Sequence, residues 1–232
     1  RNVLSLHQLG RDCRLDAENL EGFHGRRAIG CQLGIGQSQM VEFALLQHLA
    51  LVVHHAAAIA VTDDRRSVDR RRLNREAAAL ADRLRGLGAG PGDFVTIALG
   101  NGIEFVEAFV ACWMIGAIPQ PVSSKLPDAE LDAIVELAGS AVVVGRVHAG
   151  RPSLPTWDGA AVADDAPLPD SSTHDDVVSP SWKAPTSGGS TGRPKLIVHG
   201  DPSLLDPDAE PILLIQRDGC LVMPGPMYHN GP

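Results

Sequence analysis

The chain has 232 residues, and its 20 Lys and Arg against 28 Asp and Glu give a formal charge of −8 with His neutral. This balance argues against general nucleic-acid binding, because that affinity is built by neutralising phosphates with Lys and Arg. With 44% hydrophobic and 21% charged residues, the composition is that of an ordinary globular protein of one or two domains, which excludes a disordered or fibrous chain.

The cysteines and the apolar runs indicate the compartment. The cysteines are Cys13, Cys31, Cys112 and Cys220. Their separations fit neither a zinc site nor a compact disulfide framework, so a cytoplasmic location is expected. The most apolar run, residues 43–61, is interrupted by Gln47 and several histidines. Since a transmembrane helix needs roughly 18 or more uninterrupted apolar residues, we expect no transmembrane span.

Residues 1–39 show no sustained periodicity of a helix or a strand. Apolar residues at helical spacing begin at Met40 and continue to Val53. We therefore interpret Met40 as a plausible native start, and residues 1–39 as a poorly specified segment that could be a non-native extension. They are expected to contribute nothing to the core.

The next segment predicts an amphipathic helix over residues 69–87. Its apolar stripe consists of Leu73, Ala77, Leu80, Leu84 and Leu87. Arginines occupy most of the remaining surface, which is typical either of a membrane or nucleic-acid contact or of a solvated face on a helix packed against a core. The net charge of −8 favours the second interpretation.

From residue 94 onward, short apolar runs alternate with amphipathic stretches. Strands are predicted over 94–99, 117–122 and 141–144, and helices over 103–113 and 128–138. This alternation with short connections predicts an α/β fold with a doubly wound, mostly parallel sheet and flanking helices. Ligands of such sheets bind outside the carboxyl ends of the strands.

Residues 152–182 contain five prolines and six aspartates but no Lys or Arg. Such a stretch buries little apolar surface, so it is expected to connect two parts of the fold at the surface. We accordingly divide the chain into an α/β subdomain over 40–150, an acidic Pro-rich connection over 151–182, and a segment over 183–232 that carries the chemistry.

The strongest chemical signal is the Gly- and hydroxyl-rich run from Thr186 to Lys195, followed by the apolar residues 196–198. Its candidate phosphate-binding residues are Thr186, Ser187, Gly188, Gly189, Ser190, Thr191, Gly192 and Lys195. The glycines free the backbone to turn its N–H groups inward, the hydroxyls add donors, and Lys195 adds a positive charge.

This run is not a Walker A loop, because Pro194 instead of Gly precedes Lys195 and a strand-like run follows it. The loop is therefore expected to join two strands. The alternative interpretation is a flexible Gly-Ser linker, but such linkers seldom end in Arg-Pro-Lys directly before an apolar strand.

The pattern from Thr186 to Lys195 resembles the phosphate-binding signature of the adenylate-forming synthetases, which include acyl-CoA synthetases, luciferases and peptide-synthetase adenylation domains. Leu196 stands where that family usually has glycine, and Gly100 replaces the common proline before Asn101. The run Pro226-Met227-Tyr228-His229 is similar to the family's next motif. The resemblance covers roughly residue 41 to the end.

The resemblance implies an enzyme that uses ATP and Mg²⁺ to attach AMP to a carboxylic acid, releases pyrophosphate, and passes the acyl group to coenzyme A. It implies that Lys195 is catalytic, that the loop holds the β and γ phosphates, and that His229 lies near the acid. The expected acid is fatty, steroid-type or aromatic.

The family's adenine motif, ribose aspartate, hinge and adenylating lysine are not found in these 232 residues. The chain is therefore expected to be part of the large N-terminal domain and to lack acid-dependent ATP–pyrophosphate exchange by itself. The alternatives are an adenylation domain that loads a carrier protein, and a non-catalytic truncated remnant.

Other chemistry is weakly signalled. The histidines His48, His54 and His55 lack suitably spaced acidic or Cys partners, so a half-buried helix face is favoured over a metal site. The aspartates between residues 158 and 176 lack the spacing of a calcium loop. No metal ligand is therefore predicted.

Overall fold

The computed structural model describes residues 4–5, 57–166, 177–187, 194–205 and 220–229. The expectations for Met40 to Val53, and for His48, His54 and His55, lie outside these ranges. So does the segment 1–39 apart from Leu4 and Ser5, which form strand β1 (Leu4–Ser5) and pair antiparallel with β8 (Leu204–Leu205).

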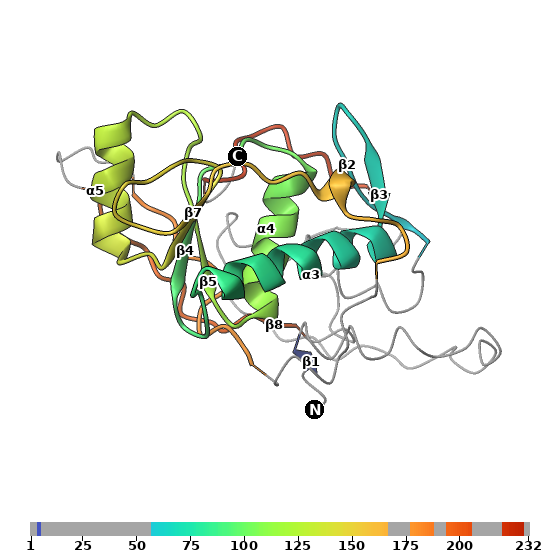
Figure 1. Ribbon diagram of the computed structural model, residues 1–232, viewed down its shortest axis with the longest axis horizontal. Helices are drawn as coiled ribbons and strands as arrows, with labels where there is room; N and C mark the ends of the chain where they lie inside the picture. The colour runs from blue at the N-terminus through green and yellow to red at the C-terminus, as the bar shows by residue number, and fades with distance from the viewer. Residues whose placement is uncertain (1–3, 6–56, 167–176, 188–193, 206–219, 230–232) are drawn as a thin grey trace, which may run out of the picture.

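The core of the fold is a four-stranded sheet with the order β5-β4-β6-β7. Figure 1 shows β4, β5 and β7 of this sheet between α5 and α4. Its strands are β4 (Phe94–Ile97), β5 (Ile118–Pro121), β6 (Val142–Val144) and β7 (Ser153–Leu154). All three pairings are parallel, which confirms the α/β fold with a parallel sheet. The sequence did not indicate β7, because it lies in the Pro- and Asp-rich stretch.

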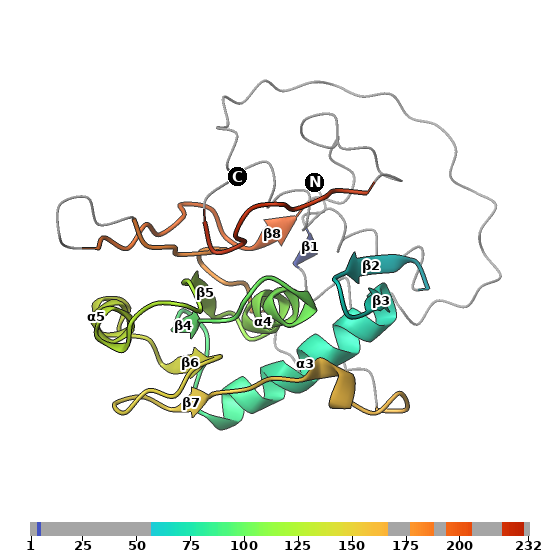
Figure 2. The same cartoon turned by 90° about the horizontal axis from the view of Figure 1, so that it is seen from above.

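Helices cover both faces of this sheet (Figure 2). They are α3 (Arg70–Gly86), α4 (Ile103–Met114) and α5 (Asp128–Ala138). Successive side chains of β6 point to opposite faces of the sheet. Val142 and Val144 belong to the cluster with α3 and α4, whereas Val143 packs with α5. α4 is buried along its whole length, as expected for a helix that is apolar nearly all round.

The predicted helices begin and end within a few residues of the observed ones. Asp69 caps α3 by accepting a hydrogen bond from the Arg72 backbone N–H, and Gly139 ends α5 in the left-handed conformation. The sequence did not predict the antiparallel hairpin of β2 (Ile59–Thr62) and β3 (Ser67–Asp69). Asp63, at its turn, accepts hydrogen bonds from the backbone N–H groups of Arg65 and Arg66.

The arginines of α3 serve contacts within the chain. Arg72 donates to the carbonyls of Gly159, Ala160 and Val162, and Arg75 donates to the Ala166 carbonyl. These bonds hold the segment that includes the short 3₁₀ turn η3 (Gly159–Ala161) against the helix. Arg72 and Arg75 of this basic helix thus serve packing inside the fold.

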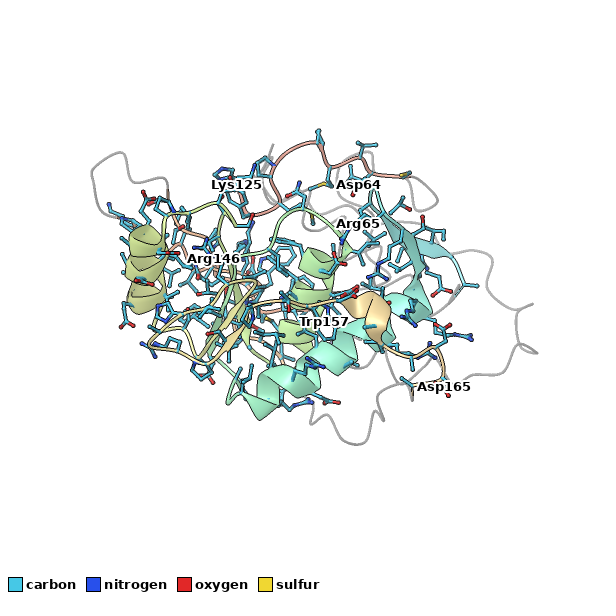
Figure 3. All side chains as sticks on the ribbon, turned by 45° about the horizontal axis from the view of Figure 1, so that its top comes forward. Asp64, Arg65, Lys125, Arg146, Trp157 and Asp165 are labelled. Carbon is cyan, nitrogen blue, oxygen red and sulfur yellow. The ribbon has the colours of Figure 1, made fainter. Side chains whose placement is uncertain are left out.

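Two buried carboxyl groups, Glu76 on α3 and Glu107 on α4, lie at the centre of a polar network. Arg66 binds Glu76 through two bonds of 3.0 Å each and reaches Glu107 at 2.9 Å. Arg72 also pairs with Glu76, and the indole N–H of Trp157 donates to Glu107. Figure 3 places Trp157 where the connecting segment crosses the two helices.

Gly145, directly after β6, is expected to be intolerant of a side chain. Its φ is +91°, and an added Cβ would lie 2.6 Å from the Ala98 carbonyl oxygen. Gly145→Ala should therefore lower the free energy of unfolding by about 2–3 kcal/mol, through backbone strain and overpacking. Chemical denaturation measures the loss. Gly88→Ala is the matched control, since Gly88 has φ +97° but open space around its Cβ position; equal losses would contradict the steric argument.

Candidate active site

The segments on either side of the phosphate-loop run form an antiparallel stem. Thr186 and Leu196 pair as an isolated bridge. The Ser187 N–H donates to the Lys195 carbonyl at 2.8 Å, and the Ile197 N–H donates to the Pro185 carbonyl at 2.8 Å. The Lys195 N–H in turn donates to the Ser187 hydroxyl oxygen at 3.1 Å. The segments that flank the loop therefore run antiparallel, but they form an isolated bridge and not the two strands that the sequence predicted.

This stem continues away from the loop. The His199 N–H donates to the Lys183 carbonyl at 3.1 Å, and the Trp182 N–H donates to the Asp201 carbonyl at 3.3 Å. Ser179 and Ser203 close the ladder through two further bonds. We call residues 179–187 and 195–203 the loop stem; several of its residues, among them Ser179, Trp182 and Ser203, are buried.

Two contacts mount the loop stem on the parallel sheet. The Ala184 N–H donates to the Pro119 carbonyl of β5 at 2.9 Å, so the stem lies beside the edge strand. The indole N–H of Trp113 on α4 donates to the Trp182 carbonyl at 2.9 Å. The Trp182 ring meets the His199 ring edge to face at 5.2 Å. The loop stem is thus hydrogen-bonded to both the sheet and α4.

The predicted phosphate-binding residues are only partly described. Thr186 and Ser187 are half-buried at the end of the stem, and Lys195 is exposed opposite Ser187. Gly188, Gly189, Ser190, Thr191 and Gly192 lie outside the described residues. The structure therefore brings Thr186, Ser187 and Lys195 together at the two ends of the loop.

Lys183 in the stem is a buried cation that the sequence analysis did not single out as a site residue. Burial lowers the pKa of its ammonium group from 10.5 to about 8. Burial also lowers the pKa of His199. The negative charge of Asp201 opposes this shift, and the positive charge of Lys183 adds to it. The base of the loop stem therefore disfavours positive charge.

This burial predicts a pH dependence of stability. Between pH 8 and 10.5 the unfolded Lys183 keeps a proton that the folded state has released. Stability should therefore rise with pH in this window relative to Lys183→Met, by up to about 3 kcal/mol at 1.36 kcal/mol per pKa unit. Urea unfolding of both proteins from pH 7 to 10.5 measures this difference. A constant difference would show that the ammonium group is not desolvated.

His229 lies in a second segment, at the carboxyl end of β4. The Asn101 side chain donates to the Gly225 carbonyl at 2.9 Å, and its oxygen accepts from the Met227 N–H at 2.9 Å. The His229 N–H donates to the Pro226 carbonyl at 3.1 Å, and its ring lies 4.4 Å from the Tyr228 ring. His229 is exposed, whereas Met227 and Tyr228 pack against the main core.

The loop stem and the segment 220–229 are both drawn above the parallel sheet in Figure 2. Among the described residues no group of three or more His, Cys, Asp or Glu side chains could hold a metal ion. In the same part of the chain, no helix combines the length and the apolar character needed to cross a bilayer.

The described part of the chain is thus an α/β protein whose parallel sheet carries, beside β5, the antiparallel stem of the Gly- and hydroxyl-rich run. Comparison with protein families matches residues 50–230 to the AMP-binding enzymes. The chain belongs to this AMP-binding enzyme family, as the resemblance of its loop implied.

The curated relatives include both CoA ligases and peptide synthetases. A feruloyl-CoA synthase from an Amycolatopsis species is 29% identical over 179 residues, which cover 72% of this chain and 34% of the relative. The long-chain-fatty-acid–CoA ligase FadD13 of Mycobacterium tuberculosis is 28% identical, covering 68% and 35%. Enterobactin synthase component F of Escherichia coli is 29% identical, covering 78% and 14%. The chain spans about a third of the length of the first two relatives.

Solved structures share the fold. The N-terminal subdomain of Klebsiella oxytoca NpsA in complex with 3-hydroxybenzoyl-AMSN superposes with a TM-score of 0.53 at 22% identity, covering 67% of this chain and 40% of that chain. VinN in complex with 3-methylaspartate superposes with a TM-score of 0.56 at 19% identity, covering 66% and 46%. The fold is thus that of the N-terminal region of adenylate-forming enzymes.

Proposed function

We propose that this chain supplies the phosphate-binding and acid-binding part of an enzyme that activates a carboxylic acid as its acyl-adenylate and then forms the CoA thioester. The observation that carries the proposal is the loop stem: it brings Ser187 and Lys195 together at the ends of the loop and is bonded to β5 and α4. Family membership supports the same chemistry.

In the proposed reaction, a carboxylate oxygen attacks the α phosphorus of ATP, and the bond from that phosphorus to the bridging oxygen breaks. Pyrophosphate leaves with the bonding electron pair. Lys195 and the hydroxyls of Thr186, Ser187, Ser190 and Thr191, together with the loop glycines Gly188, Gly189 and Gly192, would stabilise the charge that builds up on the departing phosphates. The thiol of coenzyme A then displaces AMP from the acyl carbon.

Mg²⁺ is proposed to bind together with ATP, as the counter-ion of its phosphates. Among the described residues no group of three or more His, Cys, Asp or Glu side chains could hold it. The acid is proposed to be fatty, steroid-type or aromatic, with His229 on the acid side. The relatives named for feruloyl-CoA and long-chain fatty acyl-CoA synthesis support the aromatic and fatty classes. The location proposed for the reaction is the cytoplasm, on the spacing of the cysteines.

A second candidate is transfer of the acyl group to a carrier protein. It is favoured by the match to enterobactin synthase component F, which covers 78% of this chain. The two candidates share the adenylation step and differ only in the thiol that accepts the acyl group.

The test is acid-dependent ATP–pyrophosphate exchange by the intact natural protein with fatty, steroid-type and aromatic acids. We expect exchange with at least one class, and formation of its CoA thioester when coenzyme A is added. For the Lys195→Ala variant of the same protein, the control for a general charge effect is Arg71→Ala, which removes an exposed cation of α3. A folded protein that binds ATP but shows no exchange with any of these acids would refute the proposal; acyl transfer only to a carrier-protein thiol would establish the second candidate.

A further inference from the structure

Asn101 occupies a place where three separate parts of the chain meet. It follows β4, and it precedes α4 by a single glycine. Its amide nitrogen and its amide oxygen are each bonded, at 2.9 Å, to the backbone of a segment more than 120 positions away in the sequence. Both functional groups of one side chain are thus used to hold a distant loop.

The backbone beneath Asn101 is itself fixed. The carboxylate of Asp63, from the turn between β2 and β3, accepts a hydrogen bond from the Ile103 N–H at the start of α4 at 3.2 Å. A Cβ on Gly102 would lie 3.2 Å from the same carboxylate, so the glycine allows a close approach. Figure 3 shows Arg65 at this junction, where its side chain pairs with Asp63 and Glu104. Asn101 therefore projects from an anchored loop.

Within the described part of the chain, the segment that Asn101 holds makes few other hydrogen bonds. Among the described residues 220–229, the remaining one is the turn from the His229 N–H to the Pro226 carbonyl. Met227 and Tyr228 pack on the core only in part, and residues 220–222 are exposed. Among the described residues, the two bonds of Asn101 are thus the main polar attachment of this segment.

We infer that Asn101 is a positioning residue, which holds the segment carrying His229 at the carboxyl end of β4 and thereby shapes the acid side of the site. This inference rests on the proposed function for the role of His229. It adds to that function a role for the Asn101 side chain, which shapes the acid side of the site without having to contact the acid.

Asn101 is expected to affect binding of the acid but not binding of the nucleotide. The loop stem is bonded to Pro119 and Trp113, and in the described part of the chain it makes no hydrogen bond to Asn101. Loss of the Asn101 bonds should therefore disturb binding of the acid and leave binding of ATP nearly unchanged. A residue that served only the stability of the whole fold would not produce this split.

The first experiment follows hydrogen exchange of residues 220–229 in the 232-residue chain. Asn101→Ala removes both bonds, and Asn101→Asp keeps the oxygen that accepts from the Met227 N–H. We expect exchange in this segment to be about tenfold faster in the alanine variant, as for the loss of one to two ordinary hydrogen bonds, and less accelerated in the aspartate variant. Asn74→Ala, on the half-buried face of α3, is the matched control and should leave this segment unchanged.

The second experiment measures adenylation kinetics in the intact natural protein. In Asn101→Ala the KM for the acid should rise about tenfold while the KM for ATP stays within about twofold. Equal increases in both KM values, or a fall in kcat alone, would overturn the inference. So would unchanged hydrogen exchange of residues 220–229 in Asn101→Ala. If wild type itself shows no acid-dependent exchange, the proposed function fails, and the hydrogen-exchange comparison still tests the holding role.

Discussion

Replacing Lys195 by alanine is expected to slow adenylation in the intact natural protein by about 10²- to 10³-fold, the usual cost of one preorganised donor at a developing charge. Lys195 lies at one end of the loop, where its backbone is bonded to both the N–H and the hydroxyl oxygen of Ser187. Lys195 is exposed. Its charge is therefore available to phosphates in the loop.

The measurement is the single-turnover rate of acyl-adenylate formation, compared with thioester formation from a supplied acyl-adenylate. Only the first step should be slowed, because the adenylate has already lost its pyrophosphate. Thr191→Ala should have a smaller effect, since a neutral hydroxyl makes a weaker bond. Were Lys195→Ala to slow thioester formation alone, the loop could not be assigned to the departing phosphates.

Arg66→Ala is expected to destabilise the fold by about 3–5 kcal/mol, because it leaves a buried carboxylate without its main partner. The guanidinium of Arg66 makes two 3.0 Å bonds to Glu76, whose side chain is fully buried, and one of 2.9 Å to Glu107. Urea unfolding at pH 7 measures the loss. The neighbouring Arg65 is the matched control: its side chain is 60% exposed, so Arg65→Ala should leave the Tm nearly unchanged.

Glu107→Gln should behave differently, because Glu107 is the protonated member of the carboxyl pair. Burial, together with its hydrogen bond to Glu76, raises its pKa from 4.5 to about 8. The folded state then holds an extra proton between these pH values, so wild type should lose stability relative to Glu107→Gln as pH rises from 4.5 to 8. A large loss for Glu107→Gln at pH 6 would show instead that both carboxyls are ionised.

Much of the fold could be predicted because its signals are local. The stripe of leucines and alanines identified α3, and the uninterrupted apolar runs identified β4 and β6, which are covered on both faces. The β2–β3 hairpin carried no such signal: Ile59 and Thr62 are exposed and its turn consists of charged residues. Its turn is held by Asp63 accepting backbone N–H groups, a contact that composition does not reveal.

In the candidate site too, the sequence predicted the local features and missed the contacts between distant residues. The order of glycines, hydroxyls and Lys195 identified the loop and predicted strands on both sides, since that information lies within ten consecutive residues. The mounting of the stem on Pro119, and the bonds from Asn101 to Gly225 and Met227, join residues far apart in the sequence. Such pairings depend on tertiary packing, which the periodicity of one chain does not encode.

The order of the strands has a consequence for synthesis on the ribosome. β5, β4 and β6 come from one continuous stretch ending at Val144, with α4 and α5 between them. This unit can pair its strands while residues 179–205 are still being translated, because the N-terminal portions of a protein fold first. The loop stem is then added to the free side of β5, and β1 meets β8 only after Leu205 has emerged. The candidate phosphate loop is therefore added to a sheet whose strands β4, β5 and β6 are translated before the loop.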